Sequence, residues 1–403
     1  MNRKEFLGLT AGALAALGTS ACRHNQVLPP PPVGYLPPEQ LPLARFPQKV
    51  PLLFHNDRAP LLETPLQYFQ TDLTPNHAFF VRWHLAGIPT QVDLDTWRLQ
   101  IGGRVARPLQ LSLDDLRALP ATTLLAVNQC SGNGRRFFQP RVPGGQWGNG
   151  AMGNARWTGV RLADILQRAG LAADAVAVTC RGLDEPPLPT VPPFVKSLTR
   201  AQALHPDTLV AYAMNDAPLP FLNGYPVRLV VPGWYATYWV KSLTYIEALD
   251  RPFEGFWMTK AYRVPDNPQG NERPDQPASR TVPIGQFIVR SIFVTPAGVV
   301  AAPVGRPLAL DGVAFDRGSG IARVDLSPDD GRSWQATELG PDLGGYSFRR
   351  WRTSITPAQP GNLTWRVRAT SRAGEVEALQ ANWNGGGFMY GVADQLVVAA
   401  HAA

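Results

Sequence analysis

The sequence predicts an α+β protein in which a mixed α+β domain is followed by an immunoglobulin-like β-sandwich. Its 403 residues suggest more than one domain. The 40 Pro and 37 Gly argue against a helical bundle and favour strands joined by many turns. Helix-like and strand-like segments alternate up to about residue 250, whereas only short alternating segments follow residue 283.

Residues 1–22 read as an export signal, because a short basic start and an apolar run from Phe6 to Leu17 lead to small residues before Cys22. The run is too short for a mature transmembrane span. "NRKEFLG" resembles a twin-arginine signal with Lys4 in the second arginine position, and "GTSAC" resembles a lipobox. We therefore expect a periplasmic location, with a lipid anchor at Cys22 or, alternatively, an ordinary signal end with an incidental cysteine. The Pro-rich residues 23–50 predict an extended tether.

Residues 51–264 mix strand and helix patterns. "SLDDLRALP" predicts a short helix, because Ser112 can cap it and acidic residues follow. "WTGVRLADILQRAG" predicts a turn and then a helix from Leu162 to Arg168 that Gly170 ends. Apolar, β-rich runs predict the strands "HAFFVRWHL", "WRLQIGG", "TTLLAVNQC", "AVAVTCRG" and "YPVRLVVPG".

Residues 265–283 are polar and rich in Pro, Asn and Gly, so they predict a linker. Residues 284–403 hold short alternating segments such as "PLALDGVAF", "YSFRRWRTSI" and "LTWRVRATS". Between two of these segments, "SPDDGRSW" is a hairpin signal. This region therefore predicts the immunoglobulin-like sandwich.

Charge and cysteine usage exclude several function classes. The net charge is +7, but no Lys/Arg block is present, so nucleic-acid binding is not indicated. An anionic substrate, an acidic partner or an acidic cofactor fits the charge. Cys22, Cys130 and Cys180 give neither a disulfide framework nor a zinc pattern. Without a C-x-x-C-H sequence, we expect no covalent haem on this chain.

Cys130 ends an apolar strand and opens the loop "CSGNGRR", which contains Arg135. Nearby cations favour a thiolate, the form that attacks substrates or binds metals. Cys180, by contrast, lies in an apolar strand and suits a buried small hydrophobe. A cysteine protease would need a histidine base such as His84, yet no protease signature surrounds Cys130, and one thiolate cannot hold zinc. A single thiolate beside arginines suits a metal whose other ligands come from an organic, phosphate-bearing cofactor.

Several stretches in order resemble the sulfite oxidase family of molybdenum enzymes: "FFVRWHLAGIP", "NQCSGNGRR", "QWGNGAMGNARWTGVRLADIL" and "AYAMNDAPLPFLNGYPVRLVVPGWYATYWVKSL". The R-x-H pair and "AYRVP" are more similar to its bacterial sulfite dehydrogenases than to its animal enzymes. The resemblance implies a mixed α+β molybdopterin-binding domain before the sandwich, which often mediates dimerisation. It also implies one molybdenum–molybdopterin per chain.

The resemblance assigns roles residue by residue, with Cys130 as the molybdenum ligand. The residues implied at the substrate anion are Arg82, His84, Arg135 and Tyr262. The residues implied at the cofactor are Asp184, Asn223, Arg228, Trp239, Val240 and Lys241. Each of these residues alone also fits a solvated strand end, a turn cap or a packing aromatic, so the order of the motifs carries the assignment.

The activity that the resemblance implies is oxidation of sulfite to sulfate, with electrons passed to a separate c-type cytochrome. The partner would be a second copy of this chain or a haem subunit. Two alternatives stay open: a periplasmic molybdopterin-dependent reductase of S-oxides such as methionine sulfoxide, and a non-catalytic exported binding module. Two departures bear on the substrate. "NWNGGGFMYGV" has glycines and Tyr390 where the family commonly has a basic residue, and Asn223 stands where some relatives have histidine.

Overall fold

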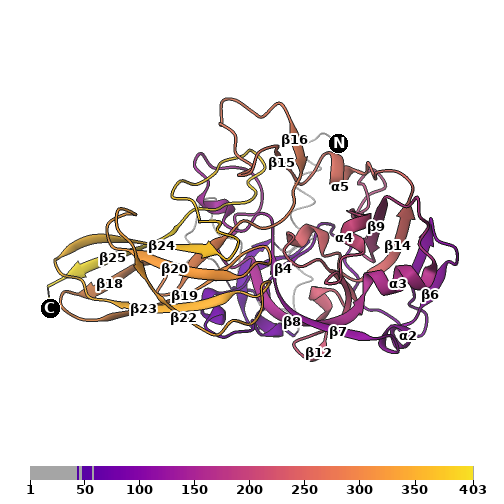
Figure 1. The fold of residues 1–403 in the computed structure, drawn as a ribbon, viewed down its shortest axis with the longest axis horizontal. Helices are drawn as coiled ribbons and strands as arrows, with labels where there is room; N and C mark the ends of the chain where they lie inside the picture. The colour runs from indigo at the N-terminus through magenta and orange to yellow at the C-terminus, as the bar shows by residue number, and fades with distance from the viewer. Residues whose placement is uncertain (1–42, 45–47, 57–58, 403) are drawn as a thin grey trace, which may run out of the picture.

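The computed structural model describes residues 43–44, 48–56 and 59–402. The expected export signal, the lipid anchor at Cys22 and most of the tether lie outside these residues. The described chain is rich in strands and has few helices, in agreement with the predicted fold class. Figure 1 shows an elongated molecule, with the strands that follow residue 284 at one end and the earlier sheets at the other.

Three sheets build the larger end of the molecule. The first has the order β1–β2–β3–β4. The second has the order β10–β9–β14–β5–β6, in which β14 and β5 run parallel. The third has the order β12–β11–β8–β7, with β13 also paired to β11. The bounds are β1 Leu43–Ala44, β2 Leu52–Asn56, β3 Leu61–Glu63, β4 Val81–Arg82, β5 Leu99–Gly103, β6 Leu109–Leu111, β7 Ala121–Gln129, β8 Met152–Arg161, β9 Ala177–Gly182, β10 Val195–Thr199, β11 Leu209–Met214, β12 Ala217–Pro218, β13 Arg228–Val230 and β14 Leu243–Leu249.

The helices are short and begin where the sequence supplies caps. Helix α2 (Leu113–Arg117) follows Ser112, whose side chain accepts from the backbone N–H of Asp115 while the Asp115 carboxylate accepts from the backbone N–H of Ser112. Helix α3 (Leu162–Ala169) ends at Gly170, which adopts the left-handed conformation. The predicted helix starts and the Gly170 stop are thus confirmed. The residues that the structure describes also include the α-helices α4 Arg200–Ala203 and α5 Phe256–Thr259.

Two local predictions were wrong. The stretch before α3 is not a turn, because β8 continues to Arg161. There, the backbone of β11 passes so close to Gly159 that a Cβ would lie 2.1 Å from the Val210 carbonyl oxygen. In residues 77–85 only β4, Val81–Arg82, is a strand. Side chains replace a neighbouring strand here: for example, Thr64 donates to the Ala78 carbonyl.

The smaller end is a β-sandwich of two sheets, in the orders β17–β19–β23–β22 and β18–β25–β24–β20–β21. The predicted hairpin is present, because β20 pairs antiparallel with β21. The expected linker is enclosed by the pair β15–β16. The bounds are β15 Arg263–Pro265, β16 Thr281–Pro283, β17 Arg290–Thr295, β18 Gly298–Pro303, β19 Leu308–Phe315, β20 Ile321–Ser327, β21 Gln335–Ala336, β22 Glu338–Leu339, β23 Arg349–Ile355, β24 Gly361–Ser371 and β25 Asp394–His401. The boundaries expected at 264/265 and 283/284 stay predictions.

The cores of the two ends are not separate. One hydrophobic cluster contains Trp157 and Trp239 from the larger end together with Phe315 and Phe348 from the sandwich, all buried. A second cluster lies between the sandwich sheets and includes Trp351. The loop between β24 and β25, residues 372–393, leaves the sandwich and packs against the loop that follows Cys130, where Met389 donates its backbone N–H to the Ser131 carbonyl.

Candidate active site

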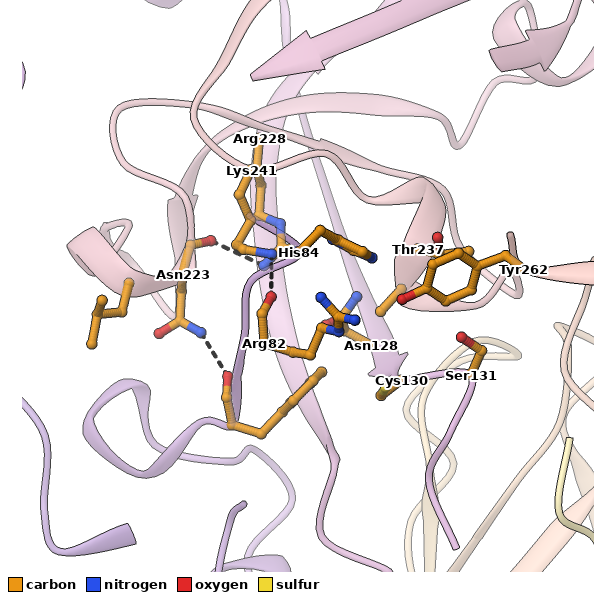
Figure 2. Close-up of a pocket in the computed structure, with 13 residues that line it drawn as sticks. Arg82, His84, Asn128, Cys130, Ser131, Asn223, Arg228, Thr237, Lys241 and Tyr262 are labelled. Atoms are coloured by element: carbon orange, nitrogen blue, oxygen red, sulfur yellow. Dashed lines mark hydrogen bonds between the residues drawn. The ribbon is translucent and has the colours of Figure 1, made fainter. Parts of the chain in front are cut away.

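A narrow inner cavity opens where β7 ends. Loops and strand ends from several sheets line it, so residues far apart in the sequence face one space (Figure 2). The lining residues are Phe80, Arg82, His84, Asn128, Cys130, Ser131, Leu222, Asn223, Arg228, Ala236, Thr237, Lys241 and Tyr262.

An outer, more open cavity of about 480 Å³ adjoins the inner one. The two cavities share Arg82, Cys130, Ser131 and Tyr262. We call these four residues the waist. Arg135 lines only the outer cavity, whereas His84 and Lys241 line only the inner one. Cys130, the residue that the sequence resemblance implies as the metal ligand, therefore lies at the junction of the two cavities.

The inner cavity is strongly cationic. Its charged lining residues within the described chain are Arg82, Arg228 and Lys241, and no Asp or Glu lines it. Burial lowers the pKa of Lys241 to about 7, and burial lowers the pKa of Arg228 to about 9. Desolvated cations gain most from an anion that enters beside them, so this cavity favours an anionic ligand.

Backbone carbonyls and aromatic rings fix these cations. Arg228 donates to the carbonyls of Asn223 at 3.0 Å and Trp239 at 3.1 Å, and its guanidinium lies 5.1 Å from the Trp157 ring centroid. Lys241 donates to the Arg82 carbonyl at 2.6 Å (Figure 2). Fixed donors of this kind are preorganised, because little reorientation is needed when a ligand binds.

Several buried polar atoms of this lining have no hydrogen-bond partner within the described residues. They are His84 Nε2, Asn128 Nδ2, Ser131 Oγ, Arg228 Nε and Thr237 Oγ1. Buried polar groups are rarely left unpaired, since each costs about 1–3 kcal/mol. Orphan donors around a cationic cavity therefore fit the chemistry of a polar, anionic ligand such as molybdopterin.

Local hydrogen bonds hold Cys130 in place. Its backbone N–H donates to the Ala151 carbonyl at 2.9 Å, and its carbonyl accepts from Asn133 at 3.0 Å. The Asn133 side chain in turn accepts from the Ala151 backbone N–H at 2.9 Å. Only 7% of Cys130 is exposed, so its thiol faces the cavities rather than bulk water.

His84 and Tyr262 form an aromatic wall beside the waist. The His84 ring stacks on Phe194 with centroids 3.6 Å apart and meets Tyr262 edge-on at 5.3 Å. Burial, with nearby Arg82, Lys241 and Lys196, holds the pKa of His84 well below its usual range, so the imidazole is neutral. Burial also raises the pKa of Tyr262, which keeps its hydroxyl protonated as a donor.

Arg135 is held by the loop that comes from the sandwich. Its guanidinium donates to the carbonyls of Gly387 at 3.1 Å, Gly386 at 3.2 Å and Gly145 at 3.3 Å. The guanidinium also lies 5.1 Å from the centroid of Phe388. Burial lowers the pKa of Arg135.

Three residues implied at the cofactor do not line either cavity: Asp184, Trp239 and Val240. Trp239 acts through its carbonyl, which accepts from Arg228. The Val240 carbonyl accepts from the backbone N–H of Leu229. Asp184 is 3% exposed; burial raises its pKa, and the charge of Lys241 opposes that rise. These three residues lie behind Arg228 and Lys241, which form the cationic wall of the inner cavity.

Sequence reasoning missed Asn128, Lys196, Thr237 and Phe388. A signal existed for Asn128, because it precedes Cys130 by two residues and side chains on a strand alternate. Lys196, on β10, had no local signal: it is 1% exposed, its Nζ donates to the Trp257 carbonyl at 2.7 Å, and burial lowers its pKa to about 7. Its ammonium lies 5.5 Å from the Tyr262 ring centroid.

Residues 43–44, 48–56 and 59–402 contain no group of three or more His, Cys, Asp or Glu that could hold a metal ion. In the same part of the chain, no helix is long and apolar enough to cross a membrane.

Known proteins resemble this chain in sequence and fold. Residues 84–257 match the family described as "oxidoreductase molybdopterin binding domain". Sulfite oxidase of Gallus gallus is 33% identical over 342 residues, which cover 81% of this chain and 72% of that protein. This chain belongs to the sulfite oxidase family. Mitochondrial sulfite oxidases of Drosophila melanogaster and Homo sapiens are 33% and 32% identical, and in each case 83% of this chain is covered.

The chain spans 58% and 60% of the length of these two mitochondrial relatives. Among solved structures, the sulfane dehydrogenase SoxCD of Paracoccus pantotrophus has the same fold, with a TM-score of 0.72 at 24% identity. The likeness covers 95% of this chain and 92% of that one. The structural likeness therefore extends over both the larger end and the sandwich of this chain.

Proposed function

We propose that this chain oxidises sulfite to sulfate at one molybdenum–molybdopterin per chain and passes the electrons to a separate c-type cytochrome. The observation that supports this most is the junction at Cys130. On one side lies a narrow cationic cavity with orphan donors, and on the other lies a wider, more open cavity. This arrangement separates a cofactor space from a substrate space and leaves one thiolate between them.

The inner cavity would hold the cofactor. The Cys130 thiolate would bind the metal, and the bound group would supply a two-electron oxidant. Arg228 and Lys241 would pair with its negative charges, since Arg228 is buried, Lys241 is half-buried, and no acid lines this cavity in the described chain. Asn223 holds Arg228 through its carbonyl and would keep this wall in place. Asp184, Trp239 and Val240 would support the same wall from behind.

The waist and the outer cavity would hold sulfite. Arg82 lines both cavities and carries a permanent charge, so its guanidinium would bind sulfite oxygens. The neutral imidazole of His84 and the protonated hydroxyl of Tyr262 would orient the anion by hydrogen bonds. Arg135 already donates to three carbonyls, so it would act mainly by adding positive potential to the outer cavity.

Metal analysis, combined with sulfite-dependent reduction of ferricyanide and cytochrome c, tests this proposal. About one molybdenum per chain together with sulfite oxidation would support it. Molybdenum without sulfite activity would favour the S-oxide reductase. Protein matured where the cofactor is available but without molybdenum would favour the binding module.

A matched cysteine pair sharpens the test. Cys130→Ala should abolish sulfite oxidation, because the proposed metal ligand is removed. Cys180→Ala is the control: Cys180 is equally buried, in β9, but lines neither cavity. Full sulfite oxidation by Cys130→Ala would contradict the assigned ligand.

We also propose that the chain works in the periplasm, as residues 1–22 predict, with residues 51–264 as the cofactor domain, 265–283 as a linker and 284–403 as a dimerisation domain. Contacts with an electron-accepting cytochrome would be small and transient. Mass spectrometry of the mature N-terminus would show whether Cys22 is lipidated. An unprocessed chain in the cytoplasm would contradict export.

A further inference from the structure

The outer cavity is far larger than sulfite requires. Its volume is about 480 Å³. At ~30 Å³ per water, this equals roughly 16 water molecules, whereas sulfite has only four heavy atoms. Sulfite bound at the waist would leave most of this space to solvent.

The walls of the outer cavity combine charge with aromatic surface. Arg82 and Arg135 supply positive charge near Cys130, and no Asp or Glu lines the cavity within the described residues. Trp257 and Phe388 are half-buried, so part of each ring faces the open space. The Trp257 ring is fixed, because its Nε1 donates to the Pro192 carbonyl at 3.3 Å. A ligand that has an anionic head and an apolar body would contact both kinds of wall.

Phe388 occupies a defined place in this wall. Its ring stacks on Tyr262 with centroids 5.3 Å apart and an interplanar angle of 20°. On the same ring lies the Arg135 guanidinium, 5.1 Å from the centroid. Gly386, two residues before Phe388, also lines the cavity and has no side chain. In this segment, where the sequence resemblance leads one to expect a basic residue, the wall is apolar and aromatic.

We infer that the site also oxidises organic sulfinates, in which an SO₂⁻ group carries an alkyl or aryl substituent. The sulfinate head would bind Arg82 at the waist, and the substituent would lie against Trp257 and Phe388. This inference rests on the proposed function, because it uses the same two-electron oxidant and the same electron acceptor.

The reaction balances as it does for sulfite: R–SO₂⁻ + H₂O → R–SO₃⁻ + 2H⁺ + 2e⁻. One sulfur–oxygen bond forms with an oxygen that water supplies, and both O–H bonds of that water break. The sulfinate is oxidised to a sulfonate, and no carbon–sulfur bond breaks. Two electrons pass to ferricyanide or the c-type cytochrome, and two protons pass to solvent.

The experiment compares benzenesulfinate, methanesulfinate and sulfite with the molybdenum-loaded enzyme, using ferricyanide reduction and chromatography of the sulfonate product. Benzenesulfinate should be oxidised, with kcat/KM about tenfold or more above that of methanesulfinate, because only the aryl group reaches the aromatic wall. Sulfite turnover without any sulfinate turnover would overturn this inference and leave the proposed function standing. Loaded enzyme that oxidises none of the three would overturn both.

The benzenesulfinate-to-sulfite ratio of kcat/KM then tests the wall itself, since the fraction of active enzyme cancels in it. Phe388→Ala should lower this ratio about tenfold by removing the ring. Tyr390→Phe is the control, because Tyr390 lies on the same loop but lines neither cavity. An unchanged ratio in Phe388→Ala would overturn the docking of the substituent. If that variant fails to fold, the comparison of benzenesulfinate with methanesulfinate in the unmodified enzyme still decides.

Discussion

Substitution of one glycine in the sandwich loop should displace a buried arginine 252 residues away. Gly387 has a φ of 61°, and its carbonyl accepts from Nε of Arg135. A Cβ on Gly387 would lie 2.6 Å from that Nε and 2.5 Å from Cγ2 of Val142. Neither neighbour is free to move, because the guanidinium is bonded to carbonyls and Val142 is 2% exposed. Gly387→Ala must therefore strain the loop and push Arg135 aside.

The expected cost of Gly387→Ala is about 2.5–5 kcal/mol in the free energy of unfolding. A non-glycine residue in the left-handed region costs about 1–2 kcal/mol. Displacement of Arg135 from the Gly387 carbonyl removes a hydrogen bond to a charged group, worth about 1.5–3 kcal/mol. The KM for sulfite should rise about tenfold, which corresponds to about 1.4 kcal/mol of lost electrostatic attraction.

Gly385→Ala is the matched control for this prediction. A Cβ on Gly385 would meet only the Glu272 carboxylate, at 3.5 Å, and its φ lies outside the left-handed region. Chemical denaturation followed by tryptophan fluorescence measures stability, and steady-state kinetics measures KM. If Gly387→Ala matched Gly385→Ala in both measurements, the argument that this loop positions Arg135 would be wrong.

Three further predictions concern cations at or near the two cavities. Arg82→Gln should raise the KM for sulfite about tenfold to a hundredfold, because one charged hydrogen bond is lost, while the exposed Arg251→Gln should leave KM unchanged. Arg228→Met should lower the molybdenum content, measured by elemental analysis, since a fixed cation leaves the inner cavity; full occupancy would contradict its role. Burial lowers the pKa of Lys196 from its ordinary value of 10.5 to about 7. Between these two pH values the unfolded chain therefore keeps the Lys196 proton, whereas the native state has lost it. The free energy of unfolding should therefore rise from pH 7 to pH 10, and it should rise less steeply in Lys196→Met than in the unmodified chain. Equal slopes in the two proteins would refute this prediction.

Local sequence patterns identified the parts of the site that one short segment determines. Cys130 was expected at a strand end, and β7 ends at Gln129. Arg82 and His84 are two residues apart, a spacing that places both side chains on one side of a strand, and both line the inner cavity although only Val81–Arg82 is a regular strand. In each case the decisive geometry spans a few residues, so a local pattern carried enough information.

The remaining features depend on contacts that no local pattern encodes. Gly159 suggested a turn, yet it lies inside β8, where the β11 backbone approaches too closely for a side chain. Residues 77–85 have a strand-like composition, but their carbonyls accept from distant side chains, including Lys49 and Asn223. Phe388 contributes to the outer cavity only because the β24–β25 loop crosses to the larger end. Such contacts follow from tertiary packing, which overrides local propensity.

The sandwich is therefore expected to be necessary for the site. Without the loop that carries Gly386 and Gly387, the buried guanidinium of Arg135 would keep only the Gly145 carbonyl as an acceptor among those it now uses. Tyr262 would also lose the ring of Phe388. A chain that ends at residue 283 should consequently show no sulfite oxidation, even if it is exported and supplied with cofactor. Assay of that truncated chain beside the full-length chain measures this, and sulfite turnover at the full-length rate would show that residues 51–283 complete the site alone.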